Sequence, residues 1–154
     1  ADAYAMADAA AGPYGNSPAT ALRRSEALTA LDSANRGGDP FFRAMLHLER
    51  AAWLTALGRR QEAVAALRWH ENNDFTGYPG LEPQAGEVDY AFGTLARWRR
   101  ARLLDTPGRT GSFAELCRCY AAVARLWGDG EPRYAARADT ARQRLATLRC
   151  ADER

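Results

Sequence analysis

The sequence of 154 residues predicts an all-α fold of about six helices. Apolar residues recur at steps of three and four along most of the chain, which is the spacing of one face of an α-helix. No segment alternates apolar and polar residues with the period of two that marks a half-buried strand. The expected turns between helices are mostly short, so we expect neighbouring helices to be antiparallel.

Local signals mark where several helices begin. Ser17-Pro18 and Asp39-Pro40 each place a capping residue before a proline, which suits the first turn of a helix. Ser112-x-x-Glu115 is a capping box directly ahead of an apolar run. The expected helices run from Ser17 to the Gly37-Gly38 pair, from Asp39 to Leu57, from Gln61 to about Glu71, from Val88 to Leu103, from Ser112 to Trp127 and from Pro132 to Leu148.

The remaining segments define the expected domain organisation. Residues 1–16 are rich in alanine and carry no amphipathic stripe, so we expect an extended or flexible N-terminal arm, held by the domain's own groove or by a neighbouring chain. Residues 72–86 are dense in Asn, Asp, Gly and Pro and are expected to form a loop. A chain of this length can bury a core without a metal or a disulfide. We therefore predict one helical-hairpin domain over residues 17–150.

Composition argues against two classes of function. The net charge is only +2, which does not indicate a general nucleic-acid-binding protein. All 21 basic residues are arginines, a bias that we attribute to GC-rich coding more than to a choice of chemistry. No apolar run approaches the ~20 residues that a membrane-spanning helix needs.

The three cysteines do not have the spacing of a zinc site, because a Cys-x-Cys pair lacks the usual second pair of ligands. Cys117 falls on the apolar face of its helix and is expected to be a small core residue. If the protein is exported, a bridge from the Cys117/Cys119 helix to Cys150 is the alternative, and it would leave one odd thiol.

One predicted helix pair has apolar residues before a Leu-Gly turn and a Glu-Ala step at the start of its second helix. The residues concerned are Ala51, Leu54, Leu57, Gly58, Glu62, Ala63, Val64 and Leu67. A later stretch repeats part of this pattern with Gly111, Phe113, Glu115, Tyr120 and Val123. In these positions the chain resembles degenerate tetratricopeptide repeats, over roughly Pro40 to Leu148. The closing run from Tyr120 to Leu148 looks like the ends of such segments in large bacterial regulatory proteins.

The resemblance implies a right-handed array of antiparallel helices that binds peptides or other proteins on a concave face, with no chemistry of its own. It also bears on where the protein works. The start Ala1-Asp2-Ala3 is compatible with cleavage of a signal peptide and export to the periplasm or beyond, or with a cytoplasmic fragment of a larger bacterial protein.

The candidate partner-binding residues lie in two places. The first is the end of the third helix and the loop after it, where long irregular segments are often functional. Its residues are Trp69, His70, Asn72, Asn73, Asp74, Phe75 and Tyr78. A structural interpretation competes, in which the two asparagines end the helix and the two loop aromatics pin the loop to the bundle.

The second place is an arginine stripe on the fourth helix that could bind an acidic surface or remain a solvated face. Its members are Arg97, Arg99, Arg100 and Arg102. We find no motif for a catalytic site, a cofactor or a metal: the oxygen-bearing residues after His70 do not alternate as in a calcium-binding EF-hand, and a phosphate-binding Walker loop needs a lysine that this chain lacks.

Three hypotheses about function follow. The first is a non-enzymatic scaffold that binds a protein partner. The second is a structural subunit of a homopolymer or of a multisubunit complex, in which residues 1–16 contact a neighbour. The third is a small enzyme that uses the loop after His70.

Overall fold

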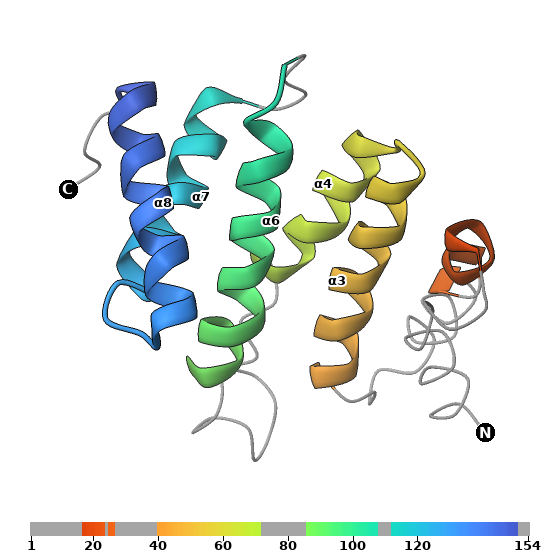
Figure 1. The fold of residues 1–154 in the computed structure, drawn as a ribbon. Helices are drawn as coiled ribbons and strands as arrows, with labels where there is room; N and C mark the ends of the chain where they lie inside the picture. Colours follow the sequence, from red (N-terminus) through yellow and green to blue (C-terminus); the bar gives the residue numbers. More distant parts are fainter. Residues whose placement is uncertain (1–16, 24, 27–39, 72–85, 108–111, 151–154) are drawn as a thin grey trace. The chain divides into compact units, whose positions relative to one another are not determined.

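The computed structural model describes residues 17–23, 25–26, 40–71, 86–107 and 112–150 (Figure 1). The chain divides into two compact units, Ala1–Asn72 and Asn73–Arg154. Within the described ranges the regular elements are all helical and none is a strand, which confirms the predicted all-α class. The expectation of one domain over residues 17–150 stays a prediction, and the expected arm at residues 1–16 lies outside the described residues.

The first unit is built around one pair of helices. A helical segment covers residues 18–23 and 25–26, and it is followed by α3 (Pro40–Ala56), α4 (Arg60–Arg68) and the 3-10 turn η1 (Trp69–Glu71). Helices α3 and α4 pack against each other (Figure 1). Gly58 ends α3 with φ +73°, a left-handed conformation that glycine adopts without a Cβ clash.

The core of the first unit comes from all three helical segments. Its buried apolar residues are Ala21, Leu22, Ala44, Leu46, Leu48, Ala51, Trp53, Leu54, Ala63, Val64 and Leu67. Two large apolar residues in the range of the predicted Asp39–Leu57 helix are not buried: Met45 is 42% exposed and Leu57 is 39% exposed. Met45 lies on the side of α3 that also carries the exposed Ala52, and Leu57 lies in the turn after the helix.

The second unit contains a helical turn over residues 86–88, the π-helical turn η2 (Asp89–Gly93), and the helices α6 (Thr94–Leu104), α7 (Phe113–Leu126) and α8 (Pro132–Leu148). Helix α7 packs against both α6 and α8 (Figure 1). The predicted starts are confirmed for the last two helices. Ser112 Oγ accepts the N–H of Glu115 at 3.0 Å, and Pro132 occupies the first turn of α8.

The π-helical turn interrupts the continuous helix that we expected from Val88. Thr94 Oγ1 donates a hydrogen bond to the Asp89 carbonyl at 3.1 Å across this turn. A Cβ on Gly93 would lie 2.1 Å from Asp89 Oδ1, so the glycine leaves the room that the Asp89 carboxylate occupies. That carboxylate is therefore free to pair with Arg97, whose Nη1 lies 2.9 Å from it.

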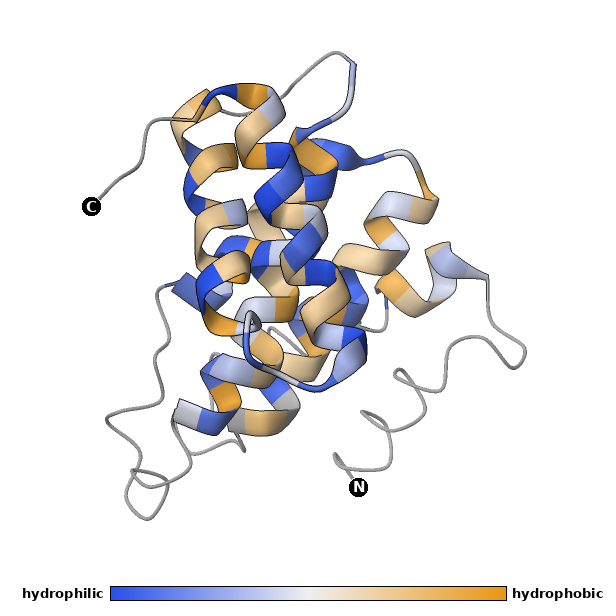
Figure 2. Cartoon of the chain, turned by 60° about the vertical axis from the view of Figure 1, so that its left-hand side comes forward, coloured by the Kyte–Doolittle hydropathy of each residue, from blue (hydrophilic) through white to orange (hydrophobic). Residues whose placement is uncertain are grey.

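The core of the second unit is contributed by α6, α7 and α8 and by the residues just before and after them. Its buried apolar residues are Val88, Ala96, Ala101, Leu104, Leu116, Cys119, Tyr120, Val123, Trp127, Ala138 and Ala141. Figure 2 shows that the helices also carry many hydrophilic residues between the hydrophobic ones. None of the helices in the described part of the chain is both long and apolar enough to cross a membrane.

The cysteines are arranged differently from our first expectation. Cys117 on α7 forms a disulfide with Cys150, and Cys119 is buried and takes no part in a disulfide. The assignment of Cys117 to the core is therefore wrong, and the alternative bridge to Cys150 is confirmed. The buried side of α7 is turned toward Glu115 and Cys119, so that Phe113, at the edge of this side, is 43% exposed.

Candidate functional site

The first unit contains an open pocket of about 410 Å³ beside α3, α4 and η1. Helix α3 contributes His47, Arg50 and Leu54 to its lining, and the rest comes from α4 and η1: Glu62, Ala65, Ala66, Arg68 and Trp69. The spacing explains the grouping, because residues three, four and seven apart lie on the same face of a helix.

Two aromatic rings form one wall of this pocket. The rings of His47 and Trp69 are stacked, with their centroids 4.5 Å apart and 12° between their planes. His70 lies edge-on to Trp69 at 5.1 Å and is 3% exposed. The turn η1 thus directs Trp69 toward the pocket and His70 toward the protein interior.

The imidazole of His47 is neutral at physiological pH. Its burial, and to a smaller extent the positive charges of Arg50 and Arg43, lower its pKa from 6.5 to about 4. His47 Nδ1 and Arg50 Nε are both buried, and neither has a hydrogen-bond partner among the described residues. Such atoms are uncommon in folded proteins, since a buried polar atom without a partner costs free energy.

The two acidic residues near the pocket, Glu62 and Glu26, pair with arginines at different distances. Glu62 accepts two hydrogen bonds from Arg59, one from Nε and one from Nη2, and this interaction lowers the pKa of Glu62. Glu26 is 3.9 Å from Arg50 Nη2, which is a long ion pair. Glu62 also interacts electrostatically with Arg50, so the lining carries two guanidinium groups, Arg50 and Arg68, against one carboxylate, and positive charge is in slight excess.

The predicted partner-binding residues of the third helix and its loop have separate outcomes. Trp69 is half-buried and lines the pocket. His70 is buried, so its imidazole has little surface for contact with a partner. The remaining candidates, Asn72, Asn73, Asp74, Phe75 and Tyr78, lie outside the described residues.

The arginine stripe on α6 is not one exposed surface, which corrects the grouping made from the sequence. Arg100 is 2% exposed, and its Nε lies 3.4 Å from Glu115 Oε1 and 3.1 Å from Cys119 Sγ on α7. Arg97 pairs with Asp89, as described above. The two arginines therefore serve contacts within the second unit, because each has an acidic partner there.

A second ion pair joins the ends of α6 and α8. Arg144 donates two hydrogen bonds of 2.7 Å to the carboxylate of Asp105, which also accepts the Tyr120 hydroxyl at 2.9 Å. Burial, followed by the interaction with Asp105, raises the pKa of Tyr120 to about 12. Arg144 is thus fixed to Asp105 although 39% of its side-chain surface is accessible.

Sequence reasoning missed His47 and Arg50 as functional candidates. Their spacing of three residues on a predicted helix was visible, but the surrounding apolar residues pointed only to packing. Within the described residues, no group of three or more His, Cys, Asp and Glu side chains is placed to hold a metal ion. The pocket lining offers two cationic groups, one acidic group, aromatic rings and apolar side chains, with positive charge in slight excess.

Comparison of the chain with protein-family models, with curated proteins and with solved structures found no match.

Proposed function

We propose that this protein is a non-enzymatic scaffold for protein–protein interaction, built from tetratricopeptide-like pairs of antiparallel helices in a right-handed array. The proposal rests on the packing of α3 against α4, which buries residues that match the tetratricopeptide pattern. Leu54 is 1% exposed, Ala63 is 0% exposed, and Gly58 has φ +73° in the turn between them. Small buried residues and a turn glycine allow two helices to approach closely.

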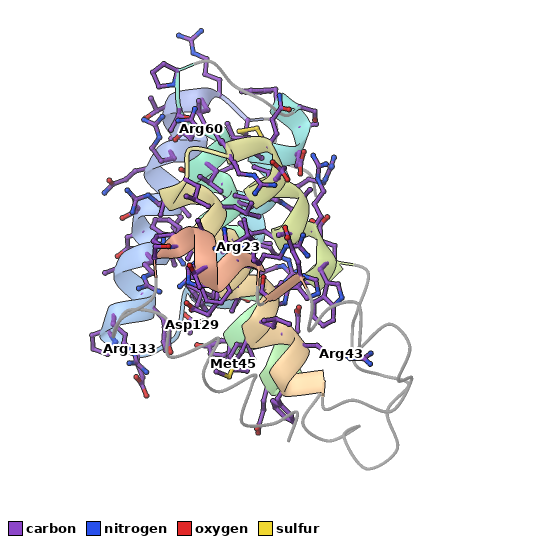
Figure 3. All side chains as sticks on the ribbon, turned by 90° about the vertical axis from the view of Figure 1, so that its right-hand side faces the viewer. Arg23, Arg43, Met45, Arg60, Asp129 and Arg133 are labelled. Atoms are coloured by element: carbon purple, nitrogen blue, oxygen red, sulfur yellow. A yellow bond between two sulfur atoms is a disulfide. The ribbon has the colours of Figure 1, made fainter. Side chains whose placement is uncertain are left out.

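We place the partner-binding surface on the exposed side of α3. Met45, Ala52 and Ala56 recur there at steps of seven and four, on the side opposite His47 and Leu54. Met45 extends from the helix at 42% exposure (Figure 3). Methionine is enriched in protein interfaces, and small residues beside it let a partner approach the helix.

A peptide-display selection with the full chain as bait tests this function. We expect peptide ligands whose dissociation constants, measured by calorimetry, rise at least fivefold when Met45→Glu places a charge on the proposed surface. Leu57→Glu is the matched control, because Leu57 is 39% exposed in the same unit and lies outside that surface. A selection without any ligand, or equal effects of the two substitutions, would contradict the proposal.

We propose further that the chain works in an oxidising compartment, which favours export over a cytoplasmic location. The supporting observation is the Cys117–Cys150 disulfide, since such bonds persist where thiols are not kept reduced. Protein extracted from its natural source in the presence of an alkylating reagent should carry one modified cysteine, Cys119, after unfolding. Modification of all the cysteines would contradict this location.

Two expectations stay predictions because the segments concerned lie outside the described residues. Assembly through residues 1–16 predicts that their deletion lowers the particle mass and leaves the helix content unchanged. An enzyme that uses the loop after His70 predicts that His70→Ala abolishes the activity.

A further inference from the structure

We propose that the pocket beside α3, α4 and η1 binds a small organic acid, namely one carboxylate carried on an apolar or aromatic group. This binding site is separate from the surface proposed above for the protein partner. Two properties of the pocket support it: a small excess of positive charge with a partly accessible Arg50 guanidinium, and an apolar remainder of suitable size.

Arg50 defines where the carboxylate lies. His47 and Arg50 are three residues apart on α3, so their side chains lie on one face of the helix and both line the pocket. His47 Nδ1 and Arg50 Nε are sealed from solvent, whereas 26% of the Arg50 side-chain surface is accessible. The two oxygen atoms of a carboxylate can accept hydrogen bonds from the accessible part of this guanidinium.

The charges around the pocket select a ligand with a single negative charge. Arg59 holds both oxygen atoms of Glu62, so this pair is close to neutral. The guanidinium of Arg50 lies 3.9 Å from Glu26, interacts electrostatically with Glu62, and keeps 26% of its side-chain surface accessible. Arg68 lines the pocket as well, so the lining carries two guanidinium groups against one carboxylate, a small positive excess that suits a monoanionic carboxylate.

The apolar body of the acid has its own place in the lining. Leu54, Ala65, Ala66 and the ring of Trp69 surround the rest of the pocket. Its volume of about 410 Å³ lies in the range of pockets that hold small molecules. A peptide backbone would bring an N–H and a carbonyl to be paired at every residue, and the described lining contains no Asn, Gln, Ser or Thr for this purpose.

Calorimetric titration of the full chain with phenylacetate tests the proposal, and phenylacetamide serves as the neutral probe of nearly the same shape. We expect phenylacetate to bind at least tenfold more tightly than phenylacetamide. Amide shifts in a ¹H–¹⁵N correlation spectrum should concentrate on α3, α4 and η1. Equal affinities for the two probes, shifts centred elsewhere, or no detectable binding of the acid would overturn the proposal, and this comparison needs no substituted protein.

Substitution of one side chain provides an independent arm. Arg50→Gln should weaken phenylacetate binding at least tenfold, because it removes the guanidinium charge that lines the pocket. Arg133→Gln is the control with the same change in net charge, at a side chain on α8 that is 70% exposed. Its expected effect is less than twofold. Equal losses in both proteins would mean that general electrostatic attraction explains the binding, and would overturn the site.

A last arm separates a free acid from a protein-borne carboxylate. A short peptide that ends in phenylalanine is titrated in its free-acid and amidated forms. Weaker binding of both peptides than of phenylacetate supports the proposal. Binding of the free-acid peptide without any binding of phenylacetate would assign the pocket to a peptide terminus and overturn the inference of a small-molecule ligand.

Discussion

The disulfide in the second unit gives the most direct prediction about stability. Cys117 and Cys150 are 33 residues apart, and the segment between them contains most of α7 and all of α8. Cross-linking a loop of this length restricts the unfolded chain by about 3.7 kcal/mol on the chain-entropy model. We therefore expect the Cys117→Ser/Cys150→Ser protein to lose about 3–4 kcal/mol of unfolding free energy in the second unit.

The assay is urea unfolding at neutral pH, followed through the indole N–H signal of Trp127. This tryptophan is fully buried and donates a hydrogen bond to the Tyr90 carbonyl at 2.9 Å, so its signal reports on the second unit. Reduction of the natural protein should lower the unfolding free energy by the same amount, and reduction should not affect the double variant. A loss below about 1 kcal/mol would refute the reasoning, since the loop would then constrain the unfolded chain very little.

Three further predictions concern single residues. Arg100→Ala leaves Glu115 buried without its ion-pair partner and should destabilise the second unit by about 3–5 kcal/mol in urea unfolding, whereas the double change Arg100→Met/Glu115→Leu should cost less. Gly58→Ala should lower the unfolding free energy by about 1 kcal/mol, because φ is +73° there and no neighbouring atom would clash; Gly86→Ala, where φ is not positive, is the control. The pKa of His47 is lower in the folded chain, about 4, than its ordinary value of 6.5, so the unfolded chain binds more protons between these values. The unfolding free energy should therefore fall by up to about 3 kcal/mol as the pH falls from 6.5 to 4. The measurement is urea unfolding at several pH values. A smaller fall in the His47→Gln protein would show that His47 causes this pH dependence.

Much of the secondary structure was accessible from the sequence because its signals are local. Ser112 accepts a backbone N–H three residues away, Pro132 has a backbone that suits a first helical turn, and Gly58 tolerates a positive φ. Each of these effects depends on neighbours within one turn of the chain. They therefore predict where helices begin and end without knowledge of the partner helices.

The direction in which each helix faces was predicted less well. The pattern on α7 is compatible with a buried side centred on Cys117 or on Cys119, which differ by two residues. Burial of Arg100 against Glu115 turns the helix toward Cys119 and leaves Cys117 to pair with Cys150. An ion pair between different helices has no periodic signature, so this choice could not be read from either helix alone.

The candidate site divides in the same way. Trp69 was predicted from its place at the end of a helix before a long loop, and it lines the pocket. His47 and Arg50 were not predicted, because their significance depends on α4 and η1 closing a pocket over one face of α3. Their missing hydrogen-bond partners are a property of three-dimensional surroundings, and no spacing in the sequence encodes them.

The sequence by itself determined the helical class, most helix ends and the turn at Gly58, because helix periodicity, capping and backbone freedom act over a few residues. Only the tertiary structure decided that Cys117 rather than Cys119 forms the disulfide and that Arg100 is buried. It also decided that His47 and Arg50 share a pocket with Trp69. These outcomes depend on contacts between residues far apart in the chain, whose free energies are realised only when the helices pack.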